Sequence, residues 1–293
     1  MKHLGISGGS TKIAGLAGAA YELIENFKYK PDIISGISAG SILALPIVFK
    51  KWDMIEQTVK NLKLSDFFSI PPVNDSGKFT FRAILRIIFG KESLGSEKNL
   101  LKKLKEFMSE EEFLYYKMNN DMPVVYIGSV DFATGGRRYF NLKDLDYYTF
   151  LHVTLASASI PIFCESVTLK VQQTQTYLFD GGVRDHIGTA WIIQNIKNIT
   201  ESVSIYSRPE DYKTDQNWTP GNVLTVLERY VDITNVEISK SDEILEDLLC
   251  EKYNIKQTKI FLPKILTSLY DVDPTRLTAL YNAGRQSAAS ALV

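Results

Sequence analysis

Residues 31–49, PDIISGISAGSILALPIVF, carry the strongest structural signal in the chain. Asp32 to Ser35 predict a short buried strand, and an apolar helix is predicted from Ser41 onward. Between them, Gly36 to Gly40 match the pattern G-x-S-x-G, in which Gly36 and Gly40 let a strand turn sharply into a helix. This turn would leave the Ser38 hydroxyl at a helix N-terminus, where free N–H groups favour a developing anion. The stretch therefore predicts a nucleophilic serine, although the same pattern also occurs by chance in such turns.

Length and composition place the chain among ordinary globular proteins. Its 293 residues are enough for one large α/β domain or two small ones, and its 45% hydrophobic and 23% charged residues are ordinary for a globular protein. We find no repeat, low-complexity tract or clear linker, so we expect a single domain over residues 1–293. A net charge of -1 gives no global basic field that would point to nucleic acid or to a strongly anionic surface.

The composition also bears on the compartment. Cys164 and Cys250 are too far apart in sequence for a zinc motif or a disulfide framework, which favours a reducing compartment. Residues 1–5 run directly into structured sequence, so we expect no signal peptide. No stretch approaches the ~20 apolar residues of a membrane span. We therefore expect a cytoplasmic protein without a transmembrane segment.

A glycine-rich turn lies near the start of the chain. Residues 2–6 predict a strand, Ser7 to Lys12 a turn, and residues 13–27 a helix. Neither the dinucleotide pattern G-x-G-x-x-G nor a P-loop is present, whereas an oxyanion hole needs only two N–H groups near the nucleophile. If the strands at 2–6 and 32–35 are parallel neighbours, this turn lies beside Ser38. A plain tight turn is the alternative interpretation.

The middle of the chain is less regular. Helices are predicted at 52–64 and 100–113, and residues 79–89 are apolar with basic residues interleaved. That last segment fits either a lid or a surface that meets lipid. Core packing of an ordinary helix is the interpretation we favour, because apolar stripes usually face a core.

The second half alternates strands and helices. We expect a central parallel strand at 122–131, because it has few polar residues. The other expected elements are a hairpin at 134–140, a helix at 149–157, strands at 167–171 and 176–179 around a Gln-Gln-Thr-Gln turn, a last main strand at 202–207, helices at 223–250 and 275–292, and a short strand at 259–262.

A serine nucleophile needs a base within hydrogen-bond reach. The chain has three histidines: His3 lies in a predicted strand and His152 in a helix interior, while His186 follows Asp180 by six residues. Asp180 lies at a strand end, and a partly desolvated carboxylate can accept a proton usefully. Two bases therefore stay open, Asp180 in a dyad and His186 in a Ser-His-Asp arrangement. The alternative to a catalytic role for Asp180 is a plain Asp-Gly turn without function in catalysis.

Four segments together resemble the patatin-like phospholipases. Residues 7–12, SGGSTK, are similar to the family's glycine-rich oxyanion stretch, and residues 36–40 to its nucleophile elbow. Residues 156–163, ASASIPIF, resemble its alanine-serine-proline helix end, and residues 180–182, DGG, its aspartate box. The chain departs from the family at two of the glycines, where Ser10 and Ile13 stand, and after Asp180, where the run is GGVRDHI.

The resemblance implies a three-layer α/β sandwich with a mostly parallel sheet and a possible helical lid at about residues 60–120. It implies a lipid acyl hydrolase with a Ser38–Asp180 dyad, no metal or cofactor, and a lipid or membrane surface as partner. The remaining residues that it singles out are the oxyanion donors Gly8, Gly9 and Ser10 and the supporting Lys12, Gly36, Gly40, Gly181 and Gly182. The alternatives are an esterase that uses His186 and a lipid-binding protein whose site has decayed.

Overall fold

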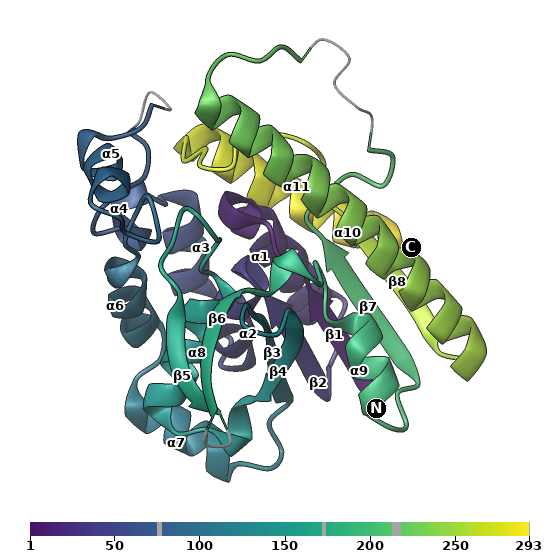
Figure 1. Cartoon of the computed structure of the whole chain (residues 1–293). Coiled ribbons are helices and arrows are strands. Elements are labelled where there is room, and N and C mark those ends of the chain that lie inside the picture. Colours follow the sequence, from purple (N-terminus) through teal and green to yellow (C-terminus); the bar gives the residue numbers. More distant parts are fainter. Residues whose placement is uncertain (75–77, 172–173, 213–217, 293) are drawn as a thin grey trace.

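A computed structural model describes residues 1–74, 78–171, 174–212 and 218–292 (Figure 1). Within these ranges a single mixed sheet of eight strands runs in the order β5-β6-β3-β2-β1-β7-β8, with β4 paired to β3. The strands are β1 (Lys2–Ile6), β2 (Ile33–Ile37), β3 (Val124–Asp131), β4 (Gly136–Asn141), β5 (Val167–Val171), β6 (Thr174–Asp180), β7 (Glu201–Tyr206) and β8 (Lys256–Phe261).

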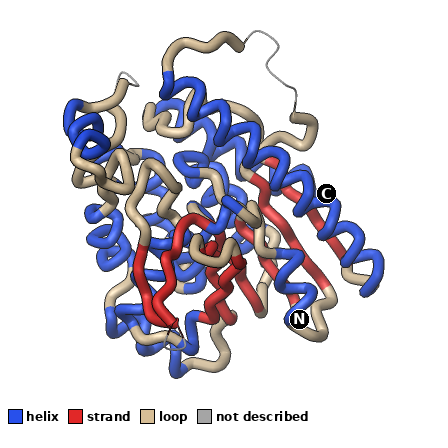
Figure 2. The backbone as a smooth tube through the Cα atoms, in the orientation of Figure 1, coloured by secondary structure: helices blue, strands red, loops and turns tan. Residues whose placement is uncertain are grey.

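Helices cover both faces of this sheet (Figure 2). They are α1 (Ile13–Tyr21), α2 (Ala39–Val48), α3 (Trp52–Lys60), α4 (Leu64–Phe67), α5 (Phe81–Ile88), α6 (Lys98–Phe107), α7 (Glu110–Met118), α8 (Tyr147–Ser157), α9 (Thr189–Asn195), α10 (Val223–Tyr253) and α11 (Pro274–Leu292). This α/β architecture confirms the predicted fold class.

Strand alternation separates the two faces. Leu4 and Ile34 point into the larger core, which also contains residues of α1, α2, α8 and α11. Ile33 belongs to the opposite core, with residues of α9 and the second half of α10. His3, on the same side, is fully buried and lies within hydrogen-bond distance of Ser35 and Ser202. These layers fix the strand ends that carry the motifs.

Three expectations need correction. Strand β3 is parallel to β2 but antiparallel to β4 and β6, so it is not parallel on both sides. Strand β8, expected only as a short strand at 259–262, is as long as β7 and pairs parallel to it at the sheet edge. The helix expected at 100–113 is two helices, since Ser109 and Glu112 form a capping box that starts α7.

Other expectations hold or stay open. The two strand-turn-helix units near the start of the chain, β1 to α1 and β2 to α2, lie where the sequence predicts them. Helices α10 and α11 match their expected ranges closely. Residues 172–173 of the Gln-Gln-Thr-Gln turn lie outside the described residues. The single-domain interpretation of 1–293 stays a prediction. Within the described ranges, no helix combines the length and apolar character needed to cross a bilayer.

Candidate active site

The serine motif forms a strained turn between β2 and α2. Ser38 has φ 52° and ψ -120°, a left-handed conformation that is uncommon for a residue with a side chain. The two glycines are required by close packing. A Cβ at Gly40 would lie 2.2 Å from the carbonyl oxygen of Ile6, and one at Gly36 would lie 2.4 Å from that of Gly40. The sequence prediction of a sharp elbow is thus explained by backbone contact with β1.

The strained serine is held from α8. Its N–H donates to Ser157 Oγ at 2.9 Å, and that hydroxyl donates to the Gly128 carbonyl at 2.6 Å. Ser41 Oγ donates to the Ser38 carbonyl at 2.6 Å. Ser157 therefore ties the elbow to β3, a role that the sequence pattern around residue 157 did not reveal.

Asp180 lies at the end of β6, against Ser38. Burial raises the pKa of Asp180 from 3.8 to about 7, opposed by hydrogen bonds from the Ser38 hydroxyl and the Gly182 N–H. The Gly182 N–H lies 2.7 Å from Oδ1, while the Asp180 N–H donates to the Ser159 carbonyl at 2.9 Å. Gly181 and Gly182 begin the short 3-10 turn Gly181–Val183. The structure thus brings together the two side chains that the sequence singled out.

The glycine-rich turn lies beside the elbow, as parallel pairing of β1 and β2 requires. A Cβ at Gly8 would lie 3.2 Å from that of Ser38. The Gly8 N–H, however, donates to the His186 carbonyl at 2.9 Å, so this N–H is already used and the expectation that it faces an oxyanion is wrong. In the described part of the chain, the Gly9 and Ser10 N–H groups have no acceptor.

Ser10 replaces a family glycine without loss of the turn. Its φ of 48° lies in the left-handed region, which explains why glycine suits this position. The Ser10 hydroxyl donates to the Leu269 carbonyl at 2.8 Å, and Thr11 donates to the same oxygen at 3.1 Å. These bonds hold the serine in a conformation that its side chain disfavours. Ile13 starts α1 and is buried in the core.

His186 contributes its backbone rather than its imidazole. Its N–H donates to Asp242 Oδ2 at 2.6 Å, and its carbonyl accepts the Gly8 N–H. Burial, together with the positive charges of Lys12 and Arg208, lowers the pKa of the imidazole to about 3. Within the described residues Nδ1 has no partner. The Ser38 hydroxyl lies close enough to Asp180 to lower the pKa of its carboxyl, whereas it does not contribute to the shifted pKa of His186.

A cavity of about 550 Å³ opens beside Ser38. Its walls come from the glycine turn, the loop 160–162, the first half of α10 and residues 263–269. None of the described residues of 60–120 lines the cavity, so the expectation of a lid in that segment is wrong. The first half of α10 lines the cavity instead. Helices α4 and α5 instead pack into a neighbouring cluster that includes Leu94 and Phe163. The sequence predicted α10 as a helix at 223–250, but nothing in the sequence indicated that it would lie over the cavity at Ser38.

Lys12 extends the site with a positive charge. It lines the cavity and has no ion-pair partner in the described ranges. Burial lowers the pKa of its ammonium group, an effect opposed by Asp232 and reinforced by Lys264. The Asp232 carboxylate already accepts hydrogen bonds from Tyr212 and Arg229. Lys12 is therefore available to an anionic group in the cavity.

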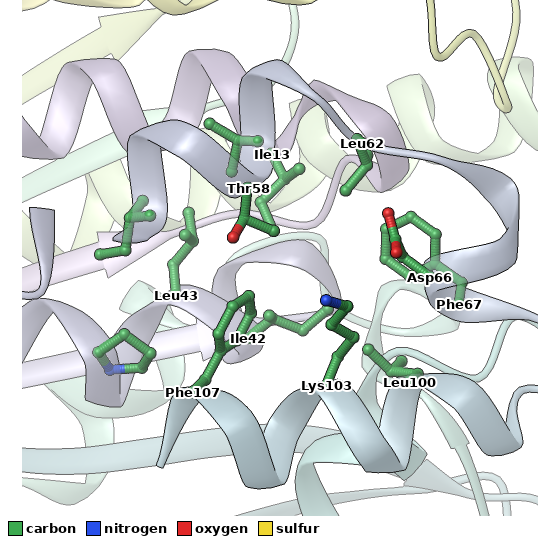
Figure 3. A pocket seen from close by; sticks show the side chains of 13 residues that line it. Ile13, Ile42, Leu43, Thr58, Leu62, Asp66, Phe67, Leu100, Lys103 and Phe107 are labelled. Carbon is green, nitrogen blue, oxygen red and sulfur yellow. The ribbon is translucent and has the colours of Figure 1, made fainter. Parts of the chain in front are cut away.

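A second hollow between α2, α3 and α6 is apolar and much smaller (Figure 3). Its volume of about 20 Å³ leaves room for about one water molecule. Ile42, Leu43 and Phe107 are among its lining side chains. It is a packing gap, and the cavity at Ser38 is the candidate site.

The comparison with protein families agrees with the motifs. A family model described as patatin-like phospholipase matches residues 4–190. Among solved structures, VipD from Legionella pneumophila is 12% identical with a TM-score of 0.41, over 99% of this chain and 66% of that chain. This chain thus spans less than two thirds of the length of VipD. No curated protein matches the chain. Since the matched residues 4–190 are more than half of the chain and include Ser38 and Asp180, the chain belongs to the patatin-like phospholipase family.

Proposed function

We propose that the protein is a serine hydrolase that cleaves fatty acyl esters of phospholipids or related glycerolipids. The observation that carries this proposal is the placement of the Ser38 hydroxyl against the buried Asp180 carboxyl, so close that it lowers the pKa of that carboxyl. A carboxylate whose pKa lies at about 7 is a far better base than one in water. Family membership supports a hydrolase that acts on lipid esters.

In this mechanism Ser38 Oγ attacks the ester carbonyl carbon while its proton passes to Asp180. The carbonyl oxygen becomes an anion, which the free N–H groups of Gly9 and Ser10 stabilise at the start of the turn that leads into α1. Asp180 then returns the proton to the alcohol oxygen as the carbon–oxygen bond breaks, leaving an acyl group on Ser38. Water, deprotonated by Asp180, then attacks the acyl carbon. The bond from this carbon to Ser38 Oγ breaks, Asp180 returns the proton to Ser38 Oγ, and the fatty acid leaves.

The cavity fits a lipid with an anionic group better than a neutral glyceride. Apolar side chains such as Ile160, Leu227 and Val231 line it and would contact acyl chains. Lys12, without an acidic partner in the described ranges, would contact a phosphate. We therefore infer a phospholipid as the preferred substrate class.

The pH dependence follows from the raised pKa of Asp180. Because only the ionised carboxylate can accept the serine proton, kcat/KM should fall about tenfold per pH unit below about pH 7. A pH–rate profile on a soluble short-chain ester measures this directly. A profile whose limb lies near the usual aspartate pKa would contradict the buried base.

His186 distinguishes the dyad from a triad. We expect His186→Gln to lower kcat/KM less than tenfold, since its imidazole has no hydrogen bond to Ser38 or Asp180. Ser38→Ala should remove the activity entirely. Circular dichroism of both variants controls for folding. A loss in His186→Gln as large as that in Ser38→Ala would favour the esterase alternative.

A further inference from the structure

Helix α5 and the residue that follows it present five large apolar side chains to solvent. Phe81, Ile84, Ile87, Ile88 and Phe89 are 74%, 43%, 59%, 69% and 73% exposed, and we call these five residues the α5 apolar face. Of the α5 residues only Ala83 is buried. A surface helix usually turns its apolar side to the core. Because these five side chains face solvent instead, the core-packing interpretation of this segment is wrong for them.

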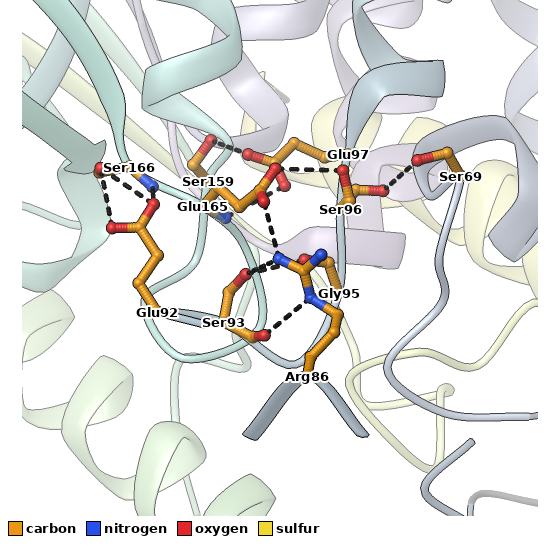
Figure 4. A network of polar contacts seen from close by, with 10 residues as sticks. All are labelled: Ser69, Arg86, Glu92, Ser93, Gly95, Ser96, Glu97, Ser159, Glu165 and Ser166. Carbon is orange, nitrogen blue, oxygen red and sulfur yellow. Dashed lines mark hydrogen bonds and ion pairs between the residues drawn. The ribbon is translucent and has the colours of Figure 1, made fainter. Parts of the chain in front are cut away.

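A charged side chain anchors α5 with this face outward. Arg86 donates to the Ser93 carbonyl and Ser93 Oγ, both at 3.0 Å, and pairs with Glu165 at 2.7 Å (Figure 4). Thr80 caps the helix by accepting the Ala83 N–H at 3.1 Å. The orientation of α5 is thus set by inward polar contacts rather than by its apolar residues.

The charge around this face is one-sided. Residues 78–91 contain Lys78, Arg82, Arg86 and Lys91 and no acidic residue, in a chain of net charge -1. Lys78, Arg82 and Lys91 are exposed, and their charged groups form no ion pair with any of the described residues. The nearest acid in sequence, Glu92, accepts hydrogen bonds from Ser166. The apolar face is therefore bordered by free positive charges, which complement an anionic surface.

The face lies close to the opening of the Ser38 cavity. Ile162 lines that cavity and is 50% exposed, and its carbonyl accepts the Leu94 N–H at 2.8 Å. Ser93, the residue before Leu94, is the anchor of Arg86. Figure 1 shows α5 and the start of α10, which helps to line the cavity, at the same end of the molecule. The α5 face and the cavity rim can thus meet one surface together.

We propose that the α5 apolar face is a docking surface for an anionic lipid bilayer, in which its aromatic and aliphatic side chains insert between head groups while Lys78, Arg82 and Lys91 contact the anionic lipids. Docking there brings the cavity rim to the bilayer, so that a lipid reaches Ser38 without crossing water. This last step rests on the proposed function. A second copy of the chain is the poorer occupant, because it would place two sets of free cations against each other.

Vesicle sedimentation tests the docking surface. The Ser38→Ala protein, which cannot degrade the lipid, is mixed with vesicles of phosphatidylcholine alone or with added phosphatidylserine. We expect binding to the anionic vesicles, a loss of about tenfold or more in Phe81→Ser/Phe89→Ser, and a loss of the preference for phosphatidylserine in Arg82→Gln/Lys91→Gln. The matched control is Ile244→Ser/Leu248→Ser, which changes side chains of α10 that are 62% and 58% exposed. This control should bind like the parent protein.

Two results would overturn the proposal. One is a parent protein that binds neither vesicle, and the other is equal binding by the α5 variants and the control. Light scattering adds a third test, since self-association that the α5 variants abolish would assign the face to a second copy. Hydrolysis of a soluble ester separates the two claims: the α5 variants should retain it, and vesicle binding without any esterase activity would refute the proposed function while supporting the docking surface.

Discussion

Asp180→Asn is expected to lower kcat/KM by about 10⁴-fold and at the same time to raise the melting temperature. The activity falls because the amide cannot accept the proton of Ser38. The stability rises because burial disfavours the ionised carboxyl in the folded chain, as its pKa of about 7 shows. Between 3.8 and about 7 the folded state binds more protons than the unfolded state, so this group makes the wild type less stable as the pH rises.

The gain in melting temperature should therefore be larger at about pH 8 than at about pH 5, where the wild-type carboxyl is also neutral. Thermal melts at both pH values, with kinetics on a soluble ester, measure the two effects. Glu246→Gln is the matched control, because Glu246 is also fully buried but bonds Ser204 and Tyr206 and does not line the cavity. Full activity in Asp180→Asn, or an equal loss in Glu246→Gln, would remove Asp180 from the mechanism.

Gly9→Ala is expected to lower kcat by about 10²-fold with little change in KM, as loss of one oxyanion donor does. The Gly8 carbonyl accepts the hydroxyls of Ser7 and Ser207, at 3.0 and 2.5 Å. Because the peptide is planar and trans, these bonds also fix the direction of the Gly9 N–H. A Cβ at Gly9 would lie 2.7 Å from the Cβ of Ser207, so the two segments must move apart and the N–H must turn.

Ser207→Ala separates this effect from misfolding. It keeps the packing but removes one of the two hydroxyls that hold the Gly8 carbonyl, and a loss of about tenfold is expected. Gly136→Ala, in the hairpin away from the cavity, is the control, since its added Cβ meets only the side chain of Thr134. Unchanged kcat in folded Gly9→Ala would assign the oxyanion to other donors.

The candidate site was predictable where its signal is local. Ser38 follows a short buried strand and lies between Gly36 and Gly40, and Asp180 ends a strand and is followed by two glycines. Both patterns can be recognised without knowledge of the fold. Parallel pairing of β1 and β2 then places the glycine turn beside the serine, as expected. The capping box of Ser109 and Glu112 is also a local signal, and it marks the start of α7. The expectation of one helix at 100–113 missed it because the apolar pattern continues across this position.

The features of the site that the sequence did not reveal depend on contacts between residues far apart in the chain. The Gly8 N–H is used by the carbonyl of His186, and the Gly8 carbonyl is held by Ser207, across most of the chain. Ser157 reaches the elbow from α8. No spacing or composition encodes such pairs. The outward orientation of the α5 apolar face could not be predicted for the same reason. It follows from the bond between Arg86 and Glu165 rather than from the spacing of the apolar residues.

The most direct measurement of the central claim is labelling by a fluorophosphonate probe, followed by intact mass and peptide mapping. We predict one adduct on Ser38 in the wild type, no adduct in Ser38→Ala, strongly slowed labelling in Asp180→Asn, and near wild-type labelling in His186→Gln. Ser166→Ala, which changes a half-buried serine bonded to Glu92, should label like the wild type. A folded wild-type protein that fails to label, or an adduct on another serine, would contradict the Ser38–Asp180 mechanism.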